Sequence, residues 1–118
     1  MSDSALFIGW GQAVRGREQK ALQIFGEVVQ YYTGLRQSGE ISAFEPIALE
    51  PHGGDLAGFA IIRGTAEQIE RLRAREDFER LNARGGMVVE RLGVVKAYVG
   101  EGLDRLFAEF GKQAAELG

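Results

Sequence analysis

The segment LAGFAIIR, residues 56–63, is apolar on both sides of an extended chain. Successive side chains of a β-strand point to opposite faces of its sheet. One face would carry Leu56, Gly58, Ala60 and Ile62, and the other Ala57, Phe59 and Ile61. A strand with one face in water would instead alternate apolar with polar residues. The segment therefore predicts a strand in a sheet whose two faces are both covered.

The segments around it predict an alternation of strands and helices. Strands are expected at 5–11, 41–50, 56–63 and 87–99, and helices from after Gly16 to about Gln37, from Thr65 to Gly85-Gly86, and over 101–117. Thr65 and Gln68 have the spacing of a capping box, which opens a helix. A slip in the apolar spacing of that helix predicts a break near 75–77.

This order, βαββαβ followed by a helix, is typical of the ferredoxin-like fold. It predicts an α+β domain spanning 1–118, with a core at 5–100 and a C-terminal helix at 101–117. The antiparallel sheet would have the strand order 4-1-3-2. Pro46 cannot donate a ladder hydrogen bond, so its strand should lie at an edge. The predicted order places that strand there.

Helices cover only one face of such a sheet, so the second apolar face needs a cover. The first and fourth predicted strands are also apolar on both sides. A large exposed apolar face is an aggregation hazard in a monomer. We therefore expect a homodimer in which two sheets pack face to face. The alternative is that the C-terminal helix folds back over the open face of its own sheet.

The element order and the doubly apolar sheet over residues 5–100 resemble the dimeric α+β barrel superfamily. The resemblance implies a ligand cleft between the helices and the sheet of each protomer. Members include cofactor-free monooxygenases and muconolactone isomerases, whose active-site residues do not match this sequence one by one. The resemblance leads us to expect a small, partly apolar ligand and no cofactor. Any reaction would be of the cofactor-free oxygenase or isomerase type. The alternative is a structural or interaction dimer with no functional pocket.

The candidate acid–base residues lie in a turn. His52 and Asp55 belong to the sequence Pro-His-Gly-Gly-Asp, and the topology brings this hairpin tip to the same end of the sheet as Arg15 and Arg84. A histidine that is hydrogen bonded to a carboxylate can act as a general base near neutral pH. The alternative is a solvated turn histidine.

Trp10, Tyr32 and Gly58 are the candidate ligand-binding residues, together with Arg15 and Arg84. Trp10 ends the first strand and Tyr32 lies on the first helix, so the two could line an apolar pocket with one polar group. Gly58 would leave room beneath the helices. The alternative is that the aromatic rings fill the core.

Composition excludes several classes of protein. The chain has no Cys and one His, which removes disulfides, thiolate metal sites and a cysteine nucleophile. No segment reaches the ~18 apolar residues of a membrane span, and the first residues do not have the polarity of a secretion signal. The formal net charge of -3 argues against general nucleic-acid binding. The expected location is the cytoplasm.

Two short segments resemble the RNA-recognition motif. Leu6-Phe7-Ile8-Gly9 is similar to its first-strand signature and Gly58-Phe59-Ala60 to part of its third-strand signature. Such modules stack bases on exposed strand aromatics. The sequence departs from the motif at Ala57, Ile61 and Gly64, so single-stranded RNA binding is a distant alternative.

Overall fold

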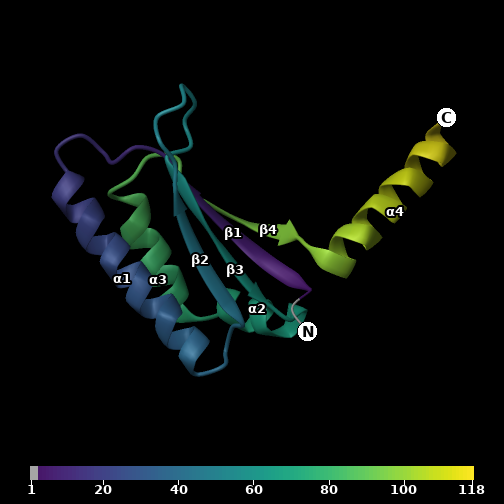
Figure 1. Ribbon diagram of the computed structural model, residues 1–118, viewed down its shortest axis with the longest axis horizontal. Coiled ribbons are helices and arrows are strands. Elements are labelled where there is room, and N and C mark those ends of the chain that lie inside the picture. Colours follow the sequence, from purple (N-terminus) through teal and green to yellow (C-terminus); the bar gives the residue numbers. More distant parts are fainter. Residues whose placement is uncertain (1–2) are drawn as a thin grey trace.

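A computed structural model describes residues 3–118 and has the predicted ferredoxin-like α+β fold (Figure 1). Its elements are β1 (Ser4–Trp10), α1 (Glu18–Gln37), β2 (Ala43–Ala48), β3 (Gly58–Gly64), α2 (Ala66–Arg73), α3 (Glu76–Gly86), β4 (Gly93–Tyr98) and α4 (Gly100–Leu117). The strands form one sheet in the order β2-β3-β1-β4. Every pair is antiparallel. The predicted strand order is therefore confirmed.

Local sequence signals act where they were expected. Pro46 lies in the edge strand β2, opposite Ala60 of β3. The capping box at the start of α2 is complete, since the Thr65 hydroxyl accepts from the Gln68 amide at 3.1 Å and Gln68 Oε1 accepts from the Thr65 amide at 2.8 Å. The predicted break separates α2 from α3, and Arg75 there has extended backbone.

The predicted fourth strand, 87–99, is wrong in its first half. Residues 93–98 pair with β1, but 87–92 form a loop that is bound to the segment after β1. The Gly11 amide donates to Glu90 O at 2.7 Å and the Val14 amide to Val88 O at 2.9 Å. Arg91 has a positive φ of 56°, which turns the chain before β4 begins. Apolar composition at 87–92 reflects packing under α1 and α3 rather than a strand.

The main core lies between the sheet and the helices α1, α2 and α3. Leu6 and Ile8 of β1 and Ile62 of β3 point toward the helices and are buried. They meet residues that recur at helical spacing on all three helices, namely Tyr32, Leu35, Ile69, Leu72, Phe78 and Leu81. This layer uses one face of the sheet.

The opposite face of the sheet carries apolar side chains that the helices do not cover. Phe7 stacks on Phe59 with ring centroids 5.5 Å apart. The Phe7 ring also lies over Gly9, where an added Cβ would be 2.6 Å from it. Val95, on the same face of β4, is 53% exposed. We call Phe7, Phe59, Ile61 and Val95 the open face.

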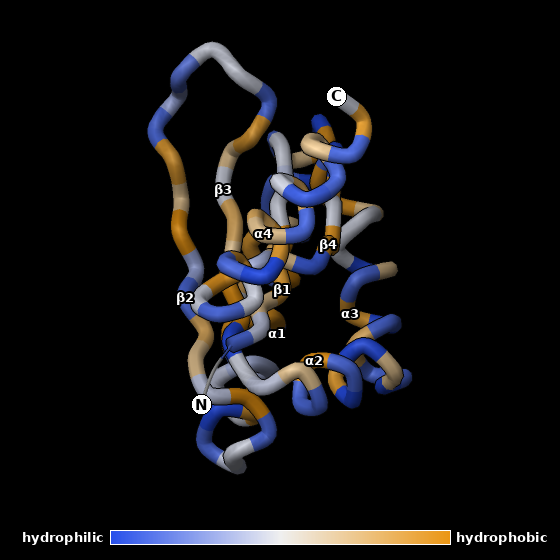
Figure 2. Tube along the Cα trace, turned by 90° about the vertical axis from the view of Figure 1, so that its right-hand side faces the viewer, coloured by the Kyte–Doolittle hydropathy of each residue, from blue (hydrophilic) through white to orange (hydrophobic). Residues whose placement is uncertain are grey.

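α4 does not cover the open face of its own sheet. It leaves the end of β4 and projects away from the body, on the side of the sheet opposite α1 and α3 (Figure 1). In Figure 2, which looks along this projection, α4 stands in front of the strands. The structure describes all of α4, and none of its residues is buried. The alternative of a helix folded back over the sheet is therefore wrong for this structure.

An ion-paired network joins α1 to the α2–α3 junction. Asp77 accepts from the Tyr31 hydroxyl at 2.7 Å and from Arg75 at 2.9 and 3.0 Å. Arg75 also donates to Glu40 at 2.6 Å. The hydrogen bonds from Arg75 and Tyr31 hold the pKa of Asp77 well below its usual range. The folded state therefore favours the ionised Asp77 carboxylate.

We predict that Asp77→Asn destabilises the protein in a pH-dependent way. Because the pKa of Asp77 is lowered by folding, its contribution is complete above the unfolded value of about 3.9 and is lost as pH falls toward the folded value. At neutral pH the loss should be roughly 1 kcal/mol, since the half-exposed site is screened by solvent. Denaturant unfolding from pH 7 to pH 3 should show that the difference in free energy of unfolding between Asp77→Asn and the unchanged protein becomes smaller. A difference that does not become smaller would contradict the assignment, and Asp104→Asn on α4 is the control.

Candidate functional site

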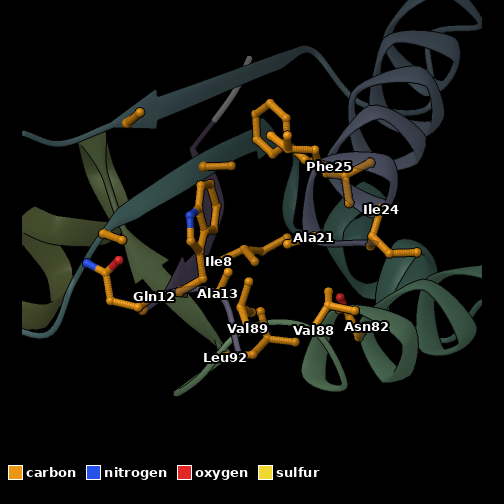
Figure 3. Close-up of a pocket in the computed structure, with 18 of the residues that line it drawn as sticks. Ile8, Gln12, Ala13, Ala21, Ile24, Phe25, Asn82, Val88, Val89 and Leu92 are labelled. Carbon is orange, nitrogen blue, oxygen red and sulfur yellow. The ribbon is translucent and has the colours of Figure 1, made fainter. Parts of the chain in front are cut away.

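A cavity of about 490 Å³ lies between the sheet, α1, α3 and the 87–92 loop (Figure 3). Most of its lining is apolar. The residues that line it are Ile8, Trp10, Gly11, Gln12, Ala13, Glu18, Ala21, Leu22, Ile24, Phe25, Val28, Tyr32, Ala48, Ala57, Ala60, Leu81, Asn82, Gly85, Val88, Val89 and Leu92. Its position is the helix–sheet cleft that the sequence resemblance implied.

Small side chains on the walls create the space. Ala60 of β3 and Ala21 of α1 lie where larger core residues would close the gap between helix and sheet. In Figure 3, Ala21 of α1 lies beside Ile8 of the sheet, Phe25 lies above them, and Val88 and Leu92 of the loop lie below them. α1 contacts the sheet through aromatic side chains rather than through close contact of its backbone.

Trp10 forms the wall of the cavity at the end of β1. Its ring meets Phe25 edge to face, with centroids 6.0 Å apart. Gly58, its direct partner on β3, makes this position available, since an added Cβ would lie 2.7 Å from Trp10 Cζ2. The room that the sequence predicted beside Gly58 is therefore filled by the indole, and the free space lies next to it.

Tyr32 belongs to the cavity lining, and its hydroxyl is buried. Its side chain is 1% exposed, and its ring stacks on Phe44 with centroids 5.0 Å apart. Among residues 3–118, its hydroxyl is the one buried side-chain polar atom without a hydrogen-bond partner. Burial raises the pKa of Tyr32 above its usual range, so the hydroxyl stays protonated at neutral pH. A buried hydroxyl with no partner is costly, by about 1–3 kcal/mol.

Polar side chains are few and lie toward the rim. Gln12 and Glu18 are exposed, and Asn82 of α3 is half-buried. The sequence interpretation missed Phe25, Asn82 and Gln12 as site residues. Phe25 has a signal, because it shares the α1 stripe with Tyr32, but that spacing is equally typical of a core residue. Asn82 had none, because it follows Leu81 in a mostly charged helix and its direction depends on how α3 packs.

His52 and Asp55 are engaged with other groups. His52 Nε2 is 2.8 Å from Leu56 O, and the Gly54 amide donates to His52 Nδ1 at 3.3 Å. These two contacts fit a neutral imidazole with its proton on Nε2. Asp55 faces Arg91 at 3.7 Å. The structure does not pair the two as a dyad, and their catalytic role stays a prediction.

Arg15 and Arg84 also lie outside the cavity lining. Arg84 donates to both oxygens of Glu27 at 3.0 and 2.9 Å, which joins α3 to α1 beside the cavity. Arg15 is exposed in the loop before α1. Neither belongs to the cavity lining, so Trp10 and Tyr32 are the predicted ligand residues that the structure brings together there.

Residues 3–118 contain no group of three or more His, Asp or Glu side chains placed to hold a metal ion. Nor does this part of the chain contain a helix that is long and apolar enough to cross a membrane.

Comparison with solved structures confirms the fold. A dimeric ferredoxin-like protein of unknown function from Bacteroides fragilis has a TM-score of 0.59 at 8% identity, over 81% of this chain and 96% of its own. SnoaB, a cofactor-independent oxygenase from Streptomyces nogalater, has a TM-score of 0.52 at 13% identity, over 83% and 96%. A proposed antibiotic biosynthesis monooxygenase from Chloroflexus aurantiacus has a TM-score of 0.51 at 16% identity, over 82% and 94%.

These likenesses confirm the predicted ferredoxin-like fold. No protein-family model matches the sequence. No curated protein matches it either. At these low identities the likeness shows architecture alone.

We predict opposite effects for two adjacent tyrosines. Tyr32→Phe removes a buried hydroxyl that has no partner, so the ligand-free protein should be unchanged or more stable, by up to about 1–2 kcal/mol. Tyr31→Phe loses the 2.7 Å hydrogen bond to Asp77 and should destabilise by about 1–2 kcal/mol. Denaturant unfolding of both variants measures this. A Tyr32→Phe loss as large as that of Tyr31→Phe would show that the Tyr32 hydroxyl has a partner in the folded protein.

Proposed function

We propose that this protein binds a small, largely apolar molecule that carries one hydrogen-bonding oxygen, in the cavity between α1, α3 and the sheet. The observation that carries the proposal is an apolar cavity of about 490 Å³ whose lining includes Tyr32, a residue with a buried hydroxyl that has no hydrogen-bond partner. Cavities of roughly 300–1,000 Å³ lined by apolar residues and a few polar groups are typical ligand sites.

The lining supports a ring-shaped ligand. Trp10 and Phe25 meet edge to face on one side of the space, and aromatic faces and edges favour contact with other rings. A carbonyl or hydroxyl oxygen of the ligand that reaches the buried Tyr32 hydroxyl would accept its proton. Gln12 and Asn82 would meet polar substituents near the rim. The chemical class is therefore a fused or single ring bearing a ketone or phenol oxygen.

Cofactor-free oxygenase or isomerase chemistry is the finer proposal. The likeness of the fold to a cofactor-independent oxygenase supports it. In the cavity, Tyr32 would hold the ligand oxygen as charge develops on it. His52 and Asp55 remain the proposed acid–base pair, on the loop whose two ends, Ala48 and Ala57, line the cavity. To act as an acid–base pair, His52 and Asp55 would have to break their present contacts and form a hydrogen bond with each other.

We also propose that the protein forms a homodimer through the open face. Phe7, Phe59 and Val95 give that face an apolar surface, and the Bacteroides fragilis neighbour is described as dimeric. A dimer with no functional pocket is the alternative function. The unpartnered Tyr32 hydroxyl disfavours it, because a purely structural core would gain stability with Phe at this position.

Binding is tested with two probes of matched shape, 1-tetralone and tetralin, which differ by one carbonyl oxygen. Trp10 is the single tryptophan of the chain and lines the cavity, so its emission reports occupancy directly. We predict that 1-tetralone quenches Trp10 emission, raises the melting temperature and binds more tightly than tetralin. In Tyr32→Phe the preference for the ketone should fall by roughly tenfold, the value of one hydrogen bond.

Two variants on α1 provide the matched control. Ala21→Phe places a large ring in the cavity, whereas Gln23→Phe places the same ring on the exposed side of the helix. Ala21→Phe should abolish the response to both probes and Gln23→Phe should keep it. Equal responses in the two variants, or no response of the unchanged protein to either probe, would contradict the proposed site.

A further inference from the structure

α4 carries an apolar stripe that residues 3–118 leave largely exposed beyond its first turn. Its apolar residues recur at intervals of three and four and share one side of the helix: Leu103, Leu106, Phe107, Phe110, Ala114 and Leu117. Phe107 is 64% exposed and Phe110 71%. Figure 2 shows hydrophilic and hydrophobic residues interleaved along this helix. The pattern is that of a helix that packs against another body.

The intrinsic signals of α4 are too weak to hold it as a free helix. Its N-cap, Val99, makes no side-chain cap hydrogen bond, and its last turn has no basic residue. Gly111 lies in its middle, where an added Cβ would meet no atom within 4 Å outside the backbone of the helix. In proteins most of the stability of a helix comes from packing of its apolar face against another body. Most of its stability must therefore come from packing.

The first turn fixes the direction in which α4 projects. Gly102 lies against the backbone of Asp3, where an added Cβ would be 3.1 Å from Asp3 O. Arg105 reaches the Asp3 carboxylate at 3.9 Å. The remaining turns extend beyond the sheet on its open side (Figure 1). α4 and the open face therefore lie on the same side of the molecule.

We propose that α4 is an arm that packs on a second copy of this chain and extends the interface made by the two open faces. This inference rests on the proposed homodimer. The partner is a second copy because the arm and the open face are continuous through β4, so one body can cover both. Half-buried Phe7 and Phe59 leave little area on the sheet itself. Phe107 and Phe110 add on the order of 300 Å² toward the ~800 Å² per partner of a stable interface.

The structural neighbours are consistent with an added arm. They cover 81–83% of this chain but 94–96% of their own chains, so this chain has a share without counterpart in them. That share is about as long as α4, which has 18 residues. The arm would then be an addition to the common fold that strengthens or restricts self-association.

The test combines light scattering with hydrogen–deuterium exchange of residues 103–117 at micromolar concentration. We expect a dimer in which these amides exchange slowly. Phe107→Glu with Phe110→Glu should make them exchange fast and weaken the dimer by at least about tenfold. Ala108→Glu with Ala115→Glu adds the same charge to the polar side of α4 and should behave as the unchanged protein.

The outcomes separate the arm from the dimer. A dimer whose α4 amides exchange as fast as those of the double-phenylalanine variant would overturn the arm and leave the open-face dimer standing. A strict monomer would overturn both. Equal weakening by the two double variants would also contradict the arm, because it would reflect charge rather than lost packing.

Discussion

A sheet that is apolar on both faces, with helices on one face only, is the constraint on which the rest of the structure depends. The helix side is closed by α1, α2 and α3, whose apolar stripes meet Leu6, Ile8 and Ile62. The other side presents Phe7 stacked on Phe59, with Val95 beside them. Since α4 stands away from that face, the proposed homodimer is the arrangement that would cover it.

The cavity follows from how the helix side is closed. Large residues such as Leu35 and Phe78 fill the layer near α2, whereas alanines face one another between α1 and β3 at the other end. Aromatic side chains bridge the gap there, because Trp10 lies over Gly58 and touches Phe25. The same arrangement leaves the Tyr32 hydroxyl without a partner. The proposed ligand, with one oxygen, would fill the space and give that hydroxyl a partner if the oxygen reaches it.

The fold could be predicted from the sequence because its signals are local and mutually consistent. Pro46 marked the edge strand, Thr65 and Gln68 opened a helix, and the alternation in 56–63 showed a doubly apolar sheet. The segment 87–92 was misassigned because its apolar residues pack beneath helices, and the turn at Arg91 leaves no mark in composition. The site was harder to predict, since it depends on which rotamers and gaps packing selects. Trp10 and Tyr32 were found by their periodic positions, but Asn82 and Phe25 join the site only through the way α1 and α3 meet the sheet. The His52–Asp55 hypothesis relied on proximity in the turn and could not foresee that Leu56 O and Arg91 would engage them.

The central claim is that a second copy covers the open face. The most direct measurement is an isotope-filtered NMR experiment on a mixture of labelled and unlabelled chains, which detects only contacts between different molecules. The predicted result is a set of intermolecular contacts to the rings of Phe7 and Phe59 and to the methyl groups of Val95. An absence of such contacts in a sample that is dimeric by light scattering would place the interface elsewhere and contradict the claim.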